Sequence, residues 1–257
     1  MSQAQSNKIE TGNFFVTNYS RSYLNSITGN WTILQDPEGV IYIGNSFNGI
    51  LVYDGQKIRR VLNNQGLPKL GGTRTLVSDS KNTIYAILGG EFGYLEKNKF
   101  GESIFYSLSD KLSKKDQVNS TLWSAGVIND TVIFQSEKSV YLYKYKKLLK
   151  VQHFNSILHT AKINKGGAFL RIWDEGLFKM TDGEFRLIPS TKEVYAQNRI
   201  DEQYYLSNGD NLLVSRTNGI WYLKKDGSLV KAKSDLLDDI VKTKESYTGG
   251  KKLKNGI

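Results

Sequence analysis

Several residue types and patterns are missing from the sequence, and each absence excludes a class of function. None of the 257 residues is a cysteine, so disulfides, thiol catalysis and cysteine-ligated metal sites are excluded. The two histidines, His153 and His159, do not have the i, i+4 spacing of a helical zinc site. The sequence also contains no calcium loop, phosphate-binding glycine loop or Gly-x-Ser-x-Gly turn. We therefore predict that the chain has no metal, no cofactor and no catalytic residues.

Long apolar runs and helical patterns are also scarce. No stretch approaches the roughly 18 apolar residues of a membrane-spanning helix, and residues 1–10 lack the apolar core of a signal peptide. The sequence has only three prolines and no long segment with helical periodicity. Two short segments, 107–117 and 234–242, are expected to form a helical turn or two within connections.

Acidic residues are outnumbered by basic ones. The chain has 25 Asp and Glu against 35 Lys and Arg, and the resulting net charge of +10 favours an anionic partner. Much of the excess lies in two patches of lysines: Lys144, Lys146, Lys147 and Lys150, and Lys242, Lys244, Lys251, Lys252 and Lys254. Lysines on exposed strands also prevent edge-to-edge pairing of sheets, and no nucleic-acid-binding module accompanies them. We interpret both patches as solvated surface and predict no nucleic-acid partner.

The sequence does contain a repeat of about 40 residues. In residues 31–58 the short strands WTILQD, VIYIGNS and ILVYDG alternate with the turns PEG and FNG. Four weaker copies follow. The residues that open the third strand of each copy are separated by steps of 37 to 46 residues: Ile50, Tyr94, Val140, Leu177 and Ile220. A unit of this length with four short strands is typical of a propeller blade.

Turn residues recur at matching places in the copies. Glycine precedes the third strand in four of them, at Gly49, Gly93, Gly176 and Gly219, as a tight hairpin turn with positive φ requires. Aspartates also recur at turn positions: Asp36, Asp54, Asp79, Asp182 and Asp226. Because aspartate in a turn accepts hydrogen bonds from the backbone, we predict a structural role for them rather than an acid–base role.

These patterns predict an all-β chain that forms a β-propeller of four-stranded antiparallel blades. We expect one domain over 1–257, with about five blades at 31–61, 75–108, 122–150, 160–189 and 203–232. Residues 252–257 are expected to start a further blade. We infer from this a truncated ring, in which residues 13–20 supply a strand that completes the last blade.

Several strings resemble the two-component regulator propeller family, the sensor propellers of bacterial receptors of the triple-tyrosine or hybrid two-component type. The clearest are residues 12–58, GGEFGYL at 89–95, WDEGLF and SRTNGIWYL, in an order and spacing that cover most of the chain. The resemblance implies a periplasmic or extracellular domain that signals through a membrane helix to a kinase or DNA-binding output. Its partners would be an oligosaccharide and the rest of its own receptor chain, and a homodimer is left open.

Tryptophans and arginines in the blades are the candidate ligand-binding residues. Trp31, Trp123 and Trp173 fall at strand positions, where aromatic residues usually pack between blades. The alternative is that some of them line a mouth where sugars stack, with polar contacts from arginines in blade strands. On that alternative we select Arg74, Trp123, Arg171 and Trp173 as candidates.

Two classes of function remain open besides a structural interaction scaffold. A non-enzymatic sensor needs no catalytic residues and binds its ligand through loops on one face. A propeller enzyme acting on polysaccharide, a glycoside hydrolase or lyase, would gather acids or a histidine from several blades at the central channel. We expect an enzyme, but not a sensor, to carry charged residues at inward positions of several blades. The sequence shows such residues clearly in no blade, which favours the sensor.

Overall fold

The computed structural model describes Ser20, residues 29–159 and residues 161–233. These residues form five separate four-stranded sheets, in which every strand pairs antiparallel with its neighbours in the chain. The first three sheets contain β1 (Asn30–Gln35), β2 (Ile41–Asn45), β3 (Ile50–Tyr53), β4 (Ile58–Arg60), β5 (Thr73–Ser78), β6 (Ile84–Leu88), β7 (Glu91–Lys97), β8 (Ser103–Ser107), β9 (Leu122–Ile128), β10 (Thr131–Ser136), β11 (Ser139–Lys144) and β12 (Lys147–His153). The last two contain β13 (Lys162–Asn164), β14 (Gly167–Ile172), β15 (Gly176–Thr181), β16 (Glu184–Leu187), β17 (Glu202–Tyr205), β18 (Asn211–Ser215), β19 (Gly219–Leu223) and β20 (Leu229–Lys231).

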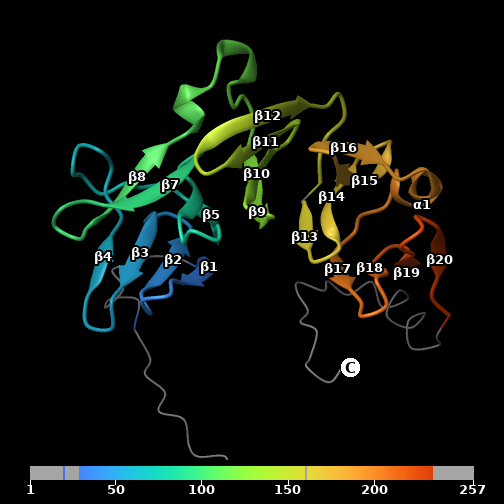
Figure 1. Ribbon diagram of the computed structural model, residues 1–257, viewed down its shortest axis with the longest axis horizontal. Coiled ribbons are helices and arrows are strands. Elements are labelled where there is room, and N and C mark those ends of the chain that lie inside the picture. The colour runs from blue at the N-terminus through green and yellow to red at the C-terminus, as the bar shows by residue number, and fades with distance from the viewer. Residues whose placement is uncertain (1–19, 21–28, 160, 234–257) are drawn as a thin grey trace, which may run out of the picture.

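The sheets follow one another around an arc, as the blades of a propeller do. The first strand of each sheet lies on the inside of the arc and the fourth on the outside (Figure 1). The inner strands of successive sheets, β1, β5, β9, β13 and β17, are in contact with one another. Among the described residues, no strand pairing joins the first sheet to the fifth. The inner strands therefore line the place of the central channel.

This architecture confirms the predicted all-β class with about five four-stranded antiparallel blades. The observed sheets span 30–60, 73–107, 122–153, 162–187 and 202–231, against predicted blades at 31–61, 75–108, 122–150, 160–189 and 203–232. The segments 13–20, 234–242 and 252–257, for which strands, a helical turn and a new blade are predicted, lie outside the described residues apart from Ser20.

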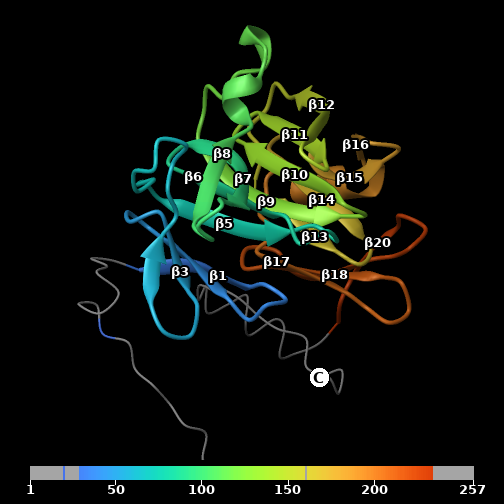
Figure 2. The ribbon, with the colours of Figure 1, turned by 60° about the vertical axis from the view of Figure 1, so that its left-hand side comes forward.

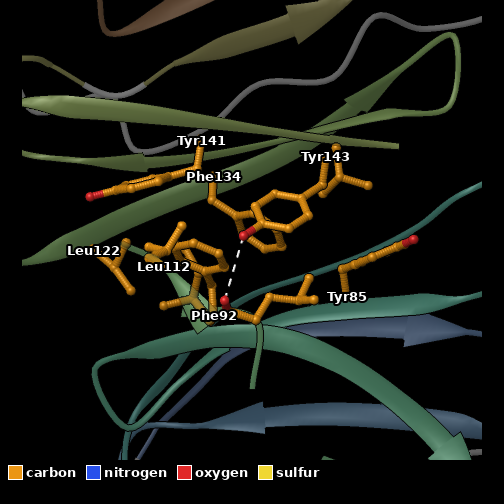
Figure 3. Packing of buried hydrophobic residues seen from close by; sticks show 10 residues of the cluster. Tyr85, Phe92, Leu112, Leu122, Phe134, Tyr141 and Tyr143 are labelled. Carbon is orange, nitrogen blue, oxygen red and sulfur yellow. Dashed lines mark hydrogen bonds between the residues drawn. The ribbon is translucent and has the colours of Figure 1, made fainter. Parts of the chain in front are cut away.

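The blades are held together by aromatic and aliphatic side chains that project from alternate strand positions. Between the second and third blades, Phe92 of β7 stacks on Phe134 of β10 with ring centroids 4.4 Å apart. Tyr141 and Tyr143 of β11 pack against the same phenylalanine ring (Figure 3). The Tyr143 hydroxyl, otherwise an unpaired polar group in this core, donates to the carbonyl of Leu108 at 3.5 Å.

The turn aspartates behave as the repeat predicts. In the first blade the Asp36 Oδ1 accepts from the backbone N–H groups of Glu38 and Val40 at 3.0 and 2.9 Å. Asp54, Asp79 and Asp226 accept equivalent bonds from the residues two positions on. Asp182 itself has a positive φ of 53° in its turn. The carboxylates of the other four aspartates thus bond to the turn backbone, which confirms the structural role predicted for them.

The predicted start of the third strand is wrong in the second blade. There β7 begins at Glu91, so Gly93 lies inside the strand, and the turn with positive φ is formed by Gly89 and Gly90. Gly93 is required for a different reason. A Cβ at this position would collide with the carbonyl oxygen of Tyr106 on β8. The glycine therefore allows close approach of two strands rather than a turn.

Glycines also let the first two blades approach closely at one end of the inner strands. Between the two blades, a Cβ on Gly72 would lie 2.9 Å from the carbonyl oxygen of Ser46, and within the second blade one on Gly71 would lie 2.5 Å from the Cα of Gly89. Gly49 donates its N–H to the Gly71 carbonyl at 3.0 Å. This contact between backbones holds the start of β5 against the turn between β2 and β3.

Gly49→Ala is expected to lower the free energy of unfolding by about 2–4 kcal/mol, because the new methyl group meets two penalties. Gly49 has a φ of +74°, and a Cβ there would collide with the backbone oxygen of Lys69. Gly55→Ala is the matched control, since Gly55 has a φ of +91° but no atom within 4 Å of its Cβ position. Urea unfolding of both variants measures the difference, and equal losses would show that the close packing contributes nothing.

The connection between β8 and β9 projects beyond the sheets (Figure 2). It contains two 3-10 turns, η1 (Ser109–Lys111) and η2 (Lys114–Asp116), where the sequence predicts a helical turn or two. His153 on the outer strand β12 lies 3.0 Å from an oxygen of Asp116 and 2.8 Å from the Ser139 hydroxyl. This histidine therefore fastens the connection to the third blade, as expected for a structural residue.

Candidate ligand-binding site

The inner strands of the first three blades share an irregularity at their second residue. In each inner strand, one extra residue lies between two residues that pair with adjacent residues of the second strand of the blade. The extra residues are Trp31 in β1, Arg74 in β5 and Trp123 in β9. Such a β-bulge turns the extra side chain away from the regular alternation of the strand, and bulges are common beside functional sites.

The three bulged side chains form one stack. The Arg74 guanidinium carbon lies 4.8 Å from the centre of the Trp31 ring and 4.6 Å from the centre of the Trp123 ring. Both indoles remain accessible, with 52% of Trp31 and 41% of Trp123 exposed. The expectation that these two tryptophans pack between blades is therefore wrong, because the bulge directs them out of the interface. We call Trp31, Arg74 and Trp123 the channel-mouth stack.

Among the residues that the structure describes, no oxygen bonds the Arg74 side chain. In the part of the chain that the structure describes, no hydrogen bond or ion pair reaches its side chain, whose contacts are with the two indoles. Each cation–π contact stabilises the arrangement by about 0.5–1 kcal/mol at an exposed site. The stack thus holds a guanidinium in place while leaving its N–H donors available.

The fourth and fifth blades place His159 and Asp201 at the same position. The N–H of His159 donates to the Arg171 carbonyl at 2.8 Å, and that of Asp201 donates to the Val214 carbonyl at 2.8 Å. Both acceptors lie one residue before the end of the second strand of their blade. Five successive blades therefore have an equivalent position near the start of the inner strand, occupied in order by Trp31, Arg74, Trp123, His159 and Asp201.

The two titratable groups at this position, His159 and Asp201, differ in whether described residues already bond to their side chains. Burial, with Arg199 and Arg171 nearby, lowers the pKa of His159 to about 4, so the imidazole is neutral at physiological pH, and its Nδ1 has no partner among the described residues. Burial alone would raise the pKa of Asp201, but hydrogen bonds from the Arg216 N–H and guanidinium at 2.8 to 3.0 Å hold it below its usual range. The sequence-based expectation that inward positions carry no charged residues is wrong, since Arg74 and Asp201 lie there.

The other two predicted site residues, Arg171 and Trp173, lie together elsewhere. Arg171, in β14, is 2% exposed and its Cζ is 3.4 Å from the centre of the Trp173 ring. Its Nε and Nη2 donate to the carbonyls of Tyr195 and Ala196, at 2.8 and 2.6 Å, at the end of α1 (Lys192–Tyr195). Burial lowers the pKa of this guanidinium to about 10. The four predicted residues thus form two pairs, and only Arg74 and Trp123 belong to the channel-mouth stack.

Sequence reasoning did not select Trp31 or His159 as ligand-binding residues. The available signal was one repeat position near the start of each inner strand, where the residue type differs from blade to blade while the surrounding turns repeat. A repeat position that is structurally constant but chemically variable indicates a role outside the fold. That position can be identified only once the register of each inner strand is known.

The described residues offer no other chemistry of the kinds considered above. They contain no group of three or more His, Asp or Glu side chains that could hold a metal ion. No described helix is both long and apolar enough to cross a membrane.

Comparisons with known proteins place the fold. No family model matches the chain, and no curated protein matches its sequence. Among solved structures, it resembles catalytically inactive virginiamycin B lyase from Staphylococcus aureus with quinupristin, at 15% identity over 82% of this chain and 72% of that one, with a TM-score of 0.57. It also resembles the WD40 β-propeller domain of Doa1, at 14% identity over 78% and 67%, with a TM-score of 0.54.

Two bacterial surface or extracellular proteins are also similar. PorZ, a surface component of the type-IX secretion system of Porphyromonas gingivalis, has a TM-score of 0.54 at 12% identity, and the match covers 81% of this chain and 34% of PorZ. The extracellular domain of BT4673 from B. thetaiotaomicron, described as a one component system, has a TM-score of 0.46 at 15% identity over 82% and 35%. The chain spans about a third of the length of each. At these identities the similarity establishes the fold alone, and the chain has the fold of a β-propeller.

Proposed function

We propose that this chain is a ligand-sensing propeller from the extracytoplasmic part of a bacterial signal-transduction receptor, and that it binds its ligand at the channel-mouth stack. The observation that carries the proposal is the position of three bulged side chains, Trp31, Arg74 and Trp123, on three neighbouring inner strands. Large aromatic side chains that are held in place yet exposed are typical of recognition sites. The receptor assignment is supported by the sequence resemblance to two-component regulator propellers.

A carbohydrate is the ligand class that suits the two tryptophans. The flat apolar face of an indole can pack against the C–H face of a sugar ring, while a polar group beside it bonds to hydroxyls. Trp31 and Trp123 provide two such faces on either side of one guanidinium. On this proposal the signal passes to the rest of the receptor chain, and the blades act as a rigid scaffold.

The test is a thermal-shift screen of the chain with a panel of oligosaccharides. We expect at least one to raise the melting temperature of the wild type, because binding to the folded state stabilises it. Trp31→Ala and Trp123→Ala should abolish the shift, whereas Phe47→Ala should retain it, since Phe47 is an aromatic residue that is 64% exposed outside the stack. A shift that survives both tryptophan variants would place the site elsewhere, and no shift with any sugar would refute the carbohydrate proposal.

A propeller enzyme is the second candidate, and one observation favours it. The imidazole of His159, two blades along from Arg74, is neutral, and its buried Nδ1 has no partner among the described residues, so it is in the form that can accept a proton. The mixtures of protein and oligosaccharide from the thermal-shift screen can also be analysed for reaction products, which distinguishes an enzyme from a sensor. Turnover by the wild type that is lost in His159→Gln would establish an enzyme, and recovery of every sugar unchanged is expected for the sensor.

A further inference from the structure

The arginine of the channel-mouth stack is unusual among the described arginines, because no described oxygen bonds its side chain. Most described arginines have an oxygen within 4.0 Å: Arg59, Arg171, Arg186, Arg199 and Arg216. Arg74 has two indole rings instead and no oxygen partner among the described residues. A partly buried guanidinium without an acceptor is costly to maintain, because its charge and five N–H donors lose water without full compensation. Such an arrangement is explained if the acceptor is supplied by a ligand.

The charges around the mouth favour an anionic acceptor. The carboxylate at the equivalent position, Asp201, is bound by the Arg216 side chain and backbone, and the Arg199 Nε lies 4.0 Å from the same oxygen that the Arg216 side chain binds. No acidic residue occupies this position in the first three blades, where Trp31, Arg74 and Trp123 stand. At these five positions the one carboxylate is therefore paired with arginines, whereas the positive charge of Arg74 has no described counter-ion and attracts anions.

The geometry also suits an oxyanion. A guanidinium over which two indoles lie is restrained in orientation, and its N–H groups project from the edge of its plane. An edge of this kind binds a carboxylate, sulfate or phosphate through two parallel N–H to oxygen bonds. The start of β5, which carries Arg74, is fixed by close packing of Gly71 and Gly72 against the neighbouring turns. Little conformational freedom is lost when a ligand binds a site prepared in this way.

We propose that Arg74 is an oxyanion-binding residue, and that the ligand of the stack is an acidic saccharide whose carboxylate, sulfate or phosphate group binds the guanidinium edge while its ring packs on Trp31 or Trp123. This inference takes the location of the site from the proposed function and adds the chemical class of the ligand. Neutral sugars of the same ring structure are bound more weakly, because they leave the guanidinium without an anionic partner.

The experiment compares acidic probes with neutral counterparts by isothermal titration calorimetry. The probes are trigalacturonate and its methyl ester, a sulfated and a desulfated chondroitin disaccharide, a phosphorylated and an unphosphorylated mannose, and inorganic sulfate alone. We expect at least one acidic saccharide to bind about tenfold or more tightly than its neutral form, with an affinity that falls as salt is raised. The acidic saccharide that binds more tightly than its neutral form identifies whether the site binds a carboxylate, a sulfate or a phosphate group.

Two arginine variants with the same change of charge provide the control. Arg74→Gln should remove the preference for the acidic probe, whereas Arg59→Gln should retain it, since Arg59 is 54% exposed and paired with Asp54. Arg74→Lys should retain part of the preference, because lysine keeps the charge and loses the planar pair of donors. Circular dichroism and the melting temperature verify that each variant is folded.

Each outcome decides between the two proposals. Neutral and acidic forms that bind equally, in a manner that requires the tryptophans, would overturn the oxyanion inference and leave the proposed function standing. A preference for acid that persists in Arg74→Gln would overturn the role of Arg74. Binding of inorganic sulfate as tight as that of any saccharide would overturn the saccharide part, and failure of every probe to bind would overturn the inference as a whole.

Discussion

Phe92→Ala is expected to lower the free energy of unfolding by about 3–5 kcal/mol, the range for removal of a fully buried aromatic ring. Phe92 has no exposed surface, and its ring contacts Phe134, Tyr141 and Tyr143 from the next blade (Figure 3). The substitution removes both the apolar burial and the stacking at the interface of the second and third blades. Urea unfolding followed by near-UV circular dichroism measures the loss.

Phe100→Ala is the matched control for this core variant. Phe100 lies in the turn between β7 and β8 with 75% of its surface exposed, so its removal should change the stability by less than about 0.5 kcal/mol. A Phe92→Ala protein as stable as the Phe100→Ala protein would show that the packing between these blades does not determine stability.

Arg171→Ala is expected to lower the free energy of unfolding by about 3–4 kcal/mol, although the residue was selected from the sequence as a ligand-binding candidate. The substitution leaves the carbonyls of Tyr195 and Ala196 without their donors and removes the side chain that covers Trp173. Hydrogen bonds from a charged group contribute about 1.5–3 kcal/mol each, and the cost of the buried Arg171 Nη1, which has no partner among the described residues, offsets part of that sum. The loss should appear as a large decrease in the urea midpoint.

Two further arginine variants show whether the loss of stability in Arg171→Ala comes from the lost hydrogen bonds. Arg171→Met keeps much of the side-chain volume but no donors, so it should recover only part of the lost stability. Arg74→Ala removes an arginine that bonds no protein oxygen in the described part of the chain, and it should cost at most about 2 kcal/mol, from its two cation–π contacts. Equal destabilisation by Arg74→Ala and Arg171→Ala would contradict the structural role of Arg171.

The local parts of the fold follow from the sequence because they depend on neighbours in the chain. Turn aspartates such as Asp36 and positive-φ glycines such as Gly49 mark hairpins whose hydrogen bonds span two to four residues. Recurrence of these hairpins at 37 to 46 residues was sufficient to predict about five four-stranded blades. The start of the third strand predicted at Tyr94 is three residues too late, because the glycine before it, Gly93, is needed for strand approach and has the same appearance as a glycine needed for a turn.

The site depends on contacts between blades, which no local pattern encodes. Arg74 and Arg171 look alike in sequence, since each lies in a strand of the repeat, but one belongs to an inner strand and stacks on exposed indoles while the other is buried against α1. Trp31 and Trp123 are 92 positions apart and meet the same guanidinium only because β1, β5 and β9 lie side by side. The sequence by itself therefore determined the class of fold and its repeat, because hairpin formation is local. The tertiary structure alone decided which side chains share the channel mouth, because the register of each inner strand and its bulge arise from packing between blades.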